Sequence, residues 1–183
     1  PAEVVDTTCC ILTLDAGVRK VEPLGVILLA YLKLKLRLII AGFDVCFYPF
    51  DWRQPLSVLG QALARDLAAD PSDEIRLVAH SMGGLVCRSA IAQGARKIKQ
   101  VVMLGTPNHG SFAPVQALRG TNSVVRTVAA LDPFHDAEEL ATRVFSSFPG
   151  LYHMLPSPKK FSAVDLYSAG AWPGGFMVEL EDS

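Results

Sequence analysis

The sequence predicts an α/β fold in which a parallel sheet is flanked by helices and followed by a helical cap. Short apolar runs alternate with amphipathic segments over residues 9–104, one run stops at a serine followed closely by two glycines, and beyond Gly105 the pattern changes to short helical pieces. Alternating apolar strands and helices specify a parallel sheet with any ligand site at the carboxyl ends of its strands. We therefore expect a single domain over residues 1–183, with a sheet core in 1–109 and a cap-like region in 110–183.

The expected core elements follow one another as strand and helix. Strands are expected at 9–14, 43–48, 75–80 and 98–104, and helices at 24–40, 55–69 and 82–94. Pro55 suits the first turn of its helix, and the DPSDE segment at 70–74 provides the break before the next strand.

Residues 24–40 allow two interpretations. The KLKLRL segment at 33–38 alternates as a strand does, whereas leucines and isoleucines recur at helical spacing and end before Gly42. We favour a helix. Its apolar face is expected to pack on a sheet, which is a commoner fate than contact with a lipid surface. Lys33, Lys35 and Arg37 interrupt the segment, so it is too polar to span a bilayer.

The cap-like region is expected to consist of short helices. The first helix is expected to begin at Pro114 and to end at Gly120, and the second to begin at Asn122 or Ser123 and to end at Leu131. The third is expected to begin at Asp136, which forms an aspartate version of the capping box with Glu139. Residues 155–183 are rich in Pro, Ser, Gly and aromatic residues, which indicates irregular structure rather than a separate domain.

Composition excludes some classes of function. The formal net charge is −1, which argues against a nucleic-acid partner. Cys9, Cys10, Cys46 and Cys87 lack metal-ligand spacing, so we expect reduced, mostly buried thiols and neither metal nor cofactor. Reduced thiols and a start without signal-peptide features favour a cytoplasmic location, and no stretch is apolar enough to cross a membrane.

The segment IRLVAHSMGG at 75–84 is the most informative part of the chain. A serine hydroxyl is a poor nucleophile unless a tight strand-to-helix turn projects it into a cleft beside a base. Gly83 leaves room for such a turn after Ser81, and Ala79 takes the position of the first glycine in the usual GxSxG pattern. The amide of Met82 is then placed to stabilise an oxyanion. The alternative is a turn that contains Ser and Gly for steric reasons alone.

Three stretches together indicate a family. FYPFDWR at 47–53, LVAHSMGGLV at 77–86 and MLGTPNHGS at 103–111 resemble bacterial members of the lecithin:cholesterol acyltransferase family of α/β-hydrolases, and FPGLYHMLPS at 148–157 continues the likeness more weakly. The resemblance implies a serine acyl-enzyme mechanism on esters, often lipids. It also implies a helical cap inserted after the strand that follows the nucleophile.

The resemblance also implies roles for individual residues. Ser81 is expected to be the nucleophile and Met82 to supply an oxyanion amide, with His80 at the same cleft. The list of further cleft residues carried over by position is Asp51, Trp52, Arg53, Asn108 and His109. An Asp/Arg pair beside an indole is equally suited to fixing a loop. A histidine in a turn before glycine more often bonds the backbone than orients substrate or water.

The sequence departs from the pattern of this family at the acid and the base. In this fold the partners follow the serine in the order acid, then histidine, at the ends of later strands. The histidines after Ser81 are His109, His135 and His153, and none occupies that place. His153 with Asp132 or Asp136 is a fallback pair. Only residues 15–17 stand where a Gly-rich oxyanion loop is expected, so the chain is either part of a larger hydrolase or a shortened homologue.

Two functions follow from these patterns. The first is a serine esterase, lipase or O-acyltransferase that acts on a lipid or another ester through a Ser81 acyl-enzyme. The second is a catalytically impaired hydrolase that serves as a lipid-binding or protein-binding module, since missing strands leave an unpaired sheet edge and an apolar surface.

Overall fold

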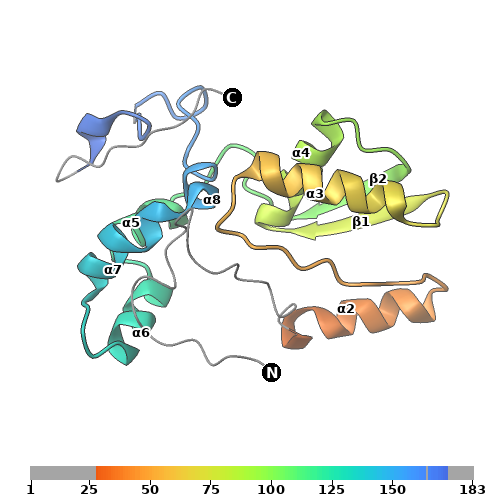
Figure 1. Ribbon diagram of the computed structural model, residues 1–183, viewed down its shortest axis with the longest axis horizontal. Helices are drawn as coiled ribbons and strands as arrows, with labels where there is room; N and C mark the ends of the chain where they lie inside the picture. Colours follow the sequence, from red (N-terminus) through yellow and green to blue (C-terminus); the bar gives the residue numbers. More distant parts are fainter. Residues whose placement is uncertain (1–27, 164, 173–183) are drawn as a thin grey trace. The chain divides into compact units, whose positions relative to one another are not determined.

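The computed structural model of the chain describes residues 28–163 and 165–172, which form two compact units (Figure 1). One unit contains residues 28–52 and the other contains residues 53–172. The strand expected at 9–14, the slot at 15–17 and the pair Cys9 and Cys10 lie outside the described residues.

The smaller unit is built on one helix. Helix α2 covers Leu28–Ile40, which confirms the helical interpretation of this segment. It ends where Gly42 adopts φ 90° and donates from its backbone N to Ile39 O at 2.9 Å. Among the described helices, none is long and apolar enough to cross a bilayer.

The strand expected at 43–48 is wrong. These residues form no helix or strand, and the described sheet has two strands, both in the larger unit. Instead Phe43 N donates back to Leu38 O at 3.1 Å, and the Lys35 ammonium lies 4.8 Å from the centre of the Phe47 ring. The run is mainly apolar, as a buried strand would be, but a strand also needs a neighbouring strand to satisfy its backbone.

The larger unit begins with the predicted sheet core. Strands β1 (Ile75–His80) and β2 (Ile98–Leu104) pair in parallel, and their last residues, His80 and Leu104, are register partners. Helix α4 (Met82–Ala92) connects them and packs on both, while helix α3 (Leu56–Ala69) packs on α4 (Figure 1). The parallel order confirms the α/β prediction and brings both strand ends to one edge.

Helices α3 and α4 approach each other closely. The stripe Leu59, Leu63 and Leu67 is buried along α3, as its four-residue spacing predicts. Between the stripe residues, Gly60 faces Ser89 of α4 so tightly that a Cβ at position 60 would lie closer than 3.0 Å to the Ser89 side chain. The Ser89 hydroxyl donates to Leu56 O at 2.9 Å, which ties the two helices together at this contact.

The cap consists of short helices around a core of their own. They are α5 (Ala113–Leu118), α6 (Ser123–Leu131), α7 (Ala137–Arg143), η1 (Phe145–Ser147) and α8 (Pro149–Tyr152), followed by η2 (Ala169–Ala171). Their buried side chains include Val125, Leu140, Val144, Phe148 and Leu155. Beyond Leu155 the described chain is irregular apart from η2, as its composition predicts.

The predicted helix caps are present. Asn122 caps α6, since its side-chain oxygen accepts from Val124 N at 2.9 Å. The capping box of α7 is complete: the Asp136 carboxylate accepts from Glu139 N at 2.8 Å, and the Glu139 carboxylate accepts from Asp136 N at 3.1 Å. These local hydrogen bonds fix where the short helices begin.

Substituting Gly60 tests the close packing of α3 and α4. Glycine to alanine ordinarily stabilises a helix interior by about 0.5–1 kcal/mol. We expect Gly60→Ala instead to lower the free energy of unfolding by about 1–3 kcal/mol, because the added methyl group overlaps Ser89. Urea unfolding measures this free energy. Gln61→Ala, at the exposed neighbouring position, is the control and should change it by less than about 0.5 kcal/mol. A stabilised Gly60→Ala variant would contradict the packing.

The two described cysteines should differ in reactivity. Cys87 is buried in α4, and burial raises the pKa of its thiol, whereas Cys46 is exposed, contrary to the expectation of mostly buried thiols. The thiolate is the form that reacts, so we expect iodoacetamide to modify Cys46 well before Cys87 in the folded protein. Peptide mass spectrometry at successive times follows both sites. Unfolding in urea should remove the difference, and equal rates in the folded protein would refute it.

Candidate active site

The turn between β1 and α4 places Ser81 in an unusual backbone conformation. Ser81 has φ 52° and ψ −126°. A positive φ is uncommon in residues other than glycine, because the Cβ atom then crowds the backbone. Two hydrogen bonds hold the turn: Ser81 N donates to Leu104 O at 2.9 Å, and Gly84 N donates to Ser81 O at 3.1 Å. The turn therefore has the sharp strand-to-helix geometry of a nucleophile elbow.

Small residues make room for this turn. Ala79 is buried in β1 two residues before the serine. On the helix side, Gly84 lies against Thr106, and a Cβ at position 84 would be closer than 3.0 Å to three Thr106 side-chain atoms. The lack of space at position 84 explains why the sequence has glycine there.

The Ser81 hydroxyl does not cap α4. Serine at the N-cap usually accepts from a backbone N–H of the first turn, but Ser81 makes no such bond, and its hydroxyl bonds no described residue. Met82 opens the helix, so its amide is one of the N–H groups that have no acceptor within the helix, while its side chain is buried. The turn thus presents an uncommitted hydroxyl next to an amide of the kind that stabilises an oxyanion.

The loop after β2 lies beside the elbow. Asn108 is exposed and its side-chain oxygen accepts from Arg88 Nη1 at 2.8 Å, which fastens the loop to α4. His109 is also exposed, and its carbonyl accepts from Ser157 N at 3.0 Å. Gly110 has φ 88° and no room for a side chain against Leu155. Both predicted residues therefore follow a strand at the same edge as Ser81, and their observed bonds hold the loop in place.

Comparison with protein families identifies the region. A model of the PGAP1-like alpha/beta domain matches residues 54–164. The chain belongs to this family. The match contains the elbow, the loop after β2 and the helical cap, and begins just beyond Arg53. No curated protein and no solved structure matches the chain.

Membership in the PGAP1-like family supports an α/β-hydrolase-like fold with a hydrolase-type function related to lipids. This agrees with the small parallel sheet and its flanking helices. The match does not confirm the closer resemblance to the lecithin:cholesterol acyltransferase family, which stays a hypothesis.

A groove of about 690 Å³ lies along α4 in the PGAP1-like domain. The start of α3, the loop at 107–110, residues 153–157 and Tyr167 complete its walls, and both His109 and His153 line it. Ser81 is not among the described lining residues. Burial lowers the pKa of the His153 imidazole below its usual value, so the ring is neutral near pH 7.

Both acids of the fallback pairs with His153, Asp132 and Asp136, have other hydrogen-bond partners nearby in the sequence. Asp132 accepts from Phe134 N at 2.8 Å and lies 2.8 Å from His135 Nδ1, and these contacts lower the pKa of its carboxyl. Asp136 is committed to the capping box of α7. Sequence reasoning missed the Asp132–His135 pair, although its spacing of three residues within one turn is the signal that indicates it. In the part of the chain that the structure describes, no histidine is hydrogen-bonded to the Ser81 hydroxyl.

The remaining predicted cleft residues divide between the two units. The Arg53 guanidinium lies 5.7 Å from the centre of the Phe148 ring, and Arg53 O accepts from Gly150 N at 3.0 Å, so Arg53 braces the cap. Asp51 and Trp52 belong to the unit of residues 28–52, where Asp51 is half-buried and Trp52 is exposed. His80 is exposed at the end of β1. Cleft roles for these residues stay predictions.

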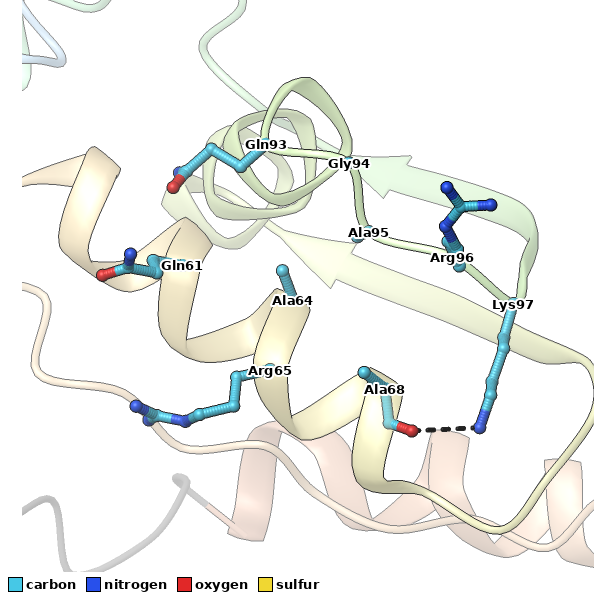
Figure 2. A pocket seen from close by; sticks show the side chains of 9 residues that line it. All are labelled: Gln61, Ala64, Arg65, Ala68, Gln93, Gly94, Ala95, Arg96 and Lys97. Carbon is cyan, nitrogen blue, oxygen red and sulfur yellow. Dashed lines mark hydrogen bonds between the residues drawn. The ribbon is translucent and has the colours of Figure 1, made fainter.

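A second hollow, of about 430 Å³, lies at the far end of α4 from Ser81, and its described lining residues include no serine, cysteine or histidine (Figure 2). Its basic side chains do not converge on one point: Arg65 and Arg96 extend in different directions. The Lys97 ammonium donates to Ala68 O at 3.1 Å and Asp70 O at 2.6 Å, so it provides hydrogen bonds to the backbone carbonyl groups at the carboxyl end of α3. No cluster of metal-ligating side chains occurs among the residues described.

The lowered pKa of His153 should make stability depend on pH. The unfolded chain binds a proton at the ordinary histidine pKa of 6.5, whereas the folded chain binds it only at lower pH. The contribution of His153 to the free energy of unfolding is therefore complete above pH 6.5 and is lost as the pH falls from 6.5 toward the lower pKa of the folded state. We expect His153→Gln to reduce the loss of unfolding free energy between about pH 7.5 and 5.5. Urea titrations at both pH values measure it, and identical losses in the two proteins would contradict it.

Proposed function

We propose that this PGAP1-like domain is a serine-dependent hydrolase or acyltransferase of lipid-like esters, with Ser81 as the nucleophile. The observation that supports it best is the backbone of Ser81, with φ 52° at the carboxyl end of β1. Such strained residues persist where the surrounding structure enforces them and are concentrated at active sites. The family match supports the coarser assignment to hydrolase-type, lipid-related chemistry.

In the proposed reaction, Ser81 Oγ forms a bond to the carbonyl carbon of an ester while its proton passes to a base. The Met82 amide donates to the oxyanion of the tetrahedral intermediate. The intermediate collapses, the alcohol part leaves with a proton, and an acyl-enzyme is left. Water or a second alcohol then takes the acyl group and restores the Ser81 hydroxyl. Hydrolysis and acyl transfer differ only in this acceptor.

The cap surface supports an apolar substrate. Phe112, Leu131 and Phe134 expose 51%, 81% and 76% of their surface. Exposed apolar side chains that adjoin one another mark contact with ligands, lipids or proteins, and Leu131 and Phe134 are only three residues apart in the sequence. Because the family is lipid-related, we propose an ester with an apolar acyl chain as the substrate class.

A binding module without turnover is the second candidate. The observation that favours it is that no described histidine bonds the Ser81 hydroxyl. A serine without its base retains only the small rate enhancement that an oxyanion site provides. In this case the groove along α4 and the cap would bind a lipid or a protein without converting it.

A fluorophosphonate probe separates the two candidates. If Ser81 is activated, the probe should label the wild-type protein at one site, and Ser81→Ala should remove the labelling completely. Ser123→Ala alters an exposed serine of α6 and should leave labelling unchanged. Circular dichroism confirms that each variant is folded. A folded wild-type protein that is not labelled would reject the enzymatic proposal in favour of the binding module.

A further inference from the structure

Thr106 occupies the space above Gly84, at the start of α4. A Cβ built on Gly84 would meet the Oγ1, Cγ2 and Cβ atoms of Thr106, all closer than 3.0 Å. The contact therefore joins the first turn of α4 to the loop that follows β2. It lies one helical turn beyond Ser81.

The Thr106 hydroxyl oxygen is the atom nearest to Gly84 in this contact, and it contributes volume rather than a hydrogen bond. Thr106 Oγ1 is buried, and no described residue forms a hydrogen bond with it. An atom out of reach of solvent does not touch a substrate, and a buried hydroxyl without a partner adds no stability. What remains is a β-branched side chain with few rotamers, which is a rigid spacer.

The backbone on both sides of the contact leads to Ser81. On the helix side, Gly84 N donates to Ser81 O at 3.1 Å. On the strand side, Leu104 O accepts from Ser81 N at 2.9 Å, and Gly105 separates Leu104 from Thr106. These bonds and the contact close a ring around the elbow. A shift of Thr106 against Gly84 therefore changes the position of Ser81.

Gly105 allows the loop to turn back toward the helix. It adopts φ 61°, and a Cβ there would meet nothing within 4 Å. Glycine is thus required for its backbone conformation and not for lack of space. The Gly-Thr pair acts as a unit in which Gly105 turns the chain and Thr106 fills the gap over Gly84.

We propose that Thr106 is a positioning residue for Ser81, because its side chain sets the distance between the start of α4 and the end of β2. This inference rests on the proposed function of Ser81. In this role Thr106 does not contact the reacting atoms. Its methyl and hydroxyl groups act only by filling the space over Gly84.

The test compares the rate of p-nitrophenyl butyrate hydrolysis by the wild-type protein with the rates of single-residue variants. Thr106→Val keeps the shape and removes the hydroxyl, and it should keep kcat within about twofold of wild type. Thr106→Ala removes the spacer and should lower kcat by about tenfold or more with KM nearly unchanged, because small misplacements of a nucleophile reduce the rate steeply. Thr127→Ala, at an exposed threonine of α6, is the matched control and should leave both constants unchanged.

Each outcome distinguishes the inference from the proposed function. If wild type and Thr106→Ala hydrolyse the ester equally well, Thr106 does not position Ser81, and the proposed function stands. If Thr106→Val loses activity as Thr106→Ala does, the hydroxyl acts chemically and the spacer role is rejected. If folded wild type shows no Ser81-dependent turnover, the proposed function and this inference both fail. Thr106→Ser, which lacks only the methyl group, gives an intermediate kcat if volume is the cause and replaces Thr106→Ala if that variant does not fold.

Discussion

The hydrogen bond from Ser81 N to Leu104 O is the constraint on which the candidate site depends. It joins the ends of β1 and β2 at the residue where the chain turns from strand to helix. The backbone of Ser81 is strained, so the turn persists only because its neighbours hold it from several directions. The Ser81 carbonyl anchors the first turn of α4, and the parallel register of the two strands sets the edge at which Ser81 lies.

The loop after β2 connects this elbow to the cap. Within a few residues it is fastened to α4 through Asn108 and Arg88, and to the cap through Ser111 N, which donates to Met154 O at 2.8 Å. The cap has a separate hydrophobic core, and Arg53 contacts it at Phe148 and Gly150. This short loop connects two separately packed regions through several hydrogen bonds. A displacement of the cap is therefore transmitted to the turn at Ser81 through only a few residues.

The sequence predicted correctly those features that depend on interactions between residues close together in the chain. The capping residues Asn122 and Asp136 were found because each helix start is determined by a side chain within three residues of it. The strand at 43–48 was not correctly predicted, because an apolar run does not reveal whether a partner strand is adjacent. The pairing of Thr106 with Gly84 has no sequence signal, since the two residues meet only after the strands and α4 have packed. The elbow was predictable because its strand, serine and glycines are contiguous.

The conformation of Ser81 also bears on the evolution of the domain. A non-glycine residue in such a backbone region costs about 1–3 kcal/mol, which is a sizeable part of the 5–15 kcal/mol that separates most native domains from unfolding. Glycine would relieve this cost and remove the hydroxyl at the same time. A lineage that retains serine at this position therefore has less mutational tolerance elsewhere, whereas a lineage released from catalysis is free to exchange the serine and gain robustness.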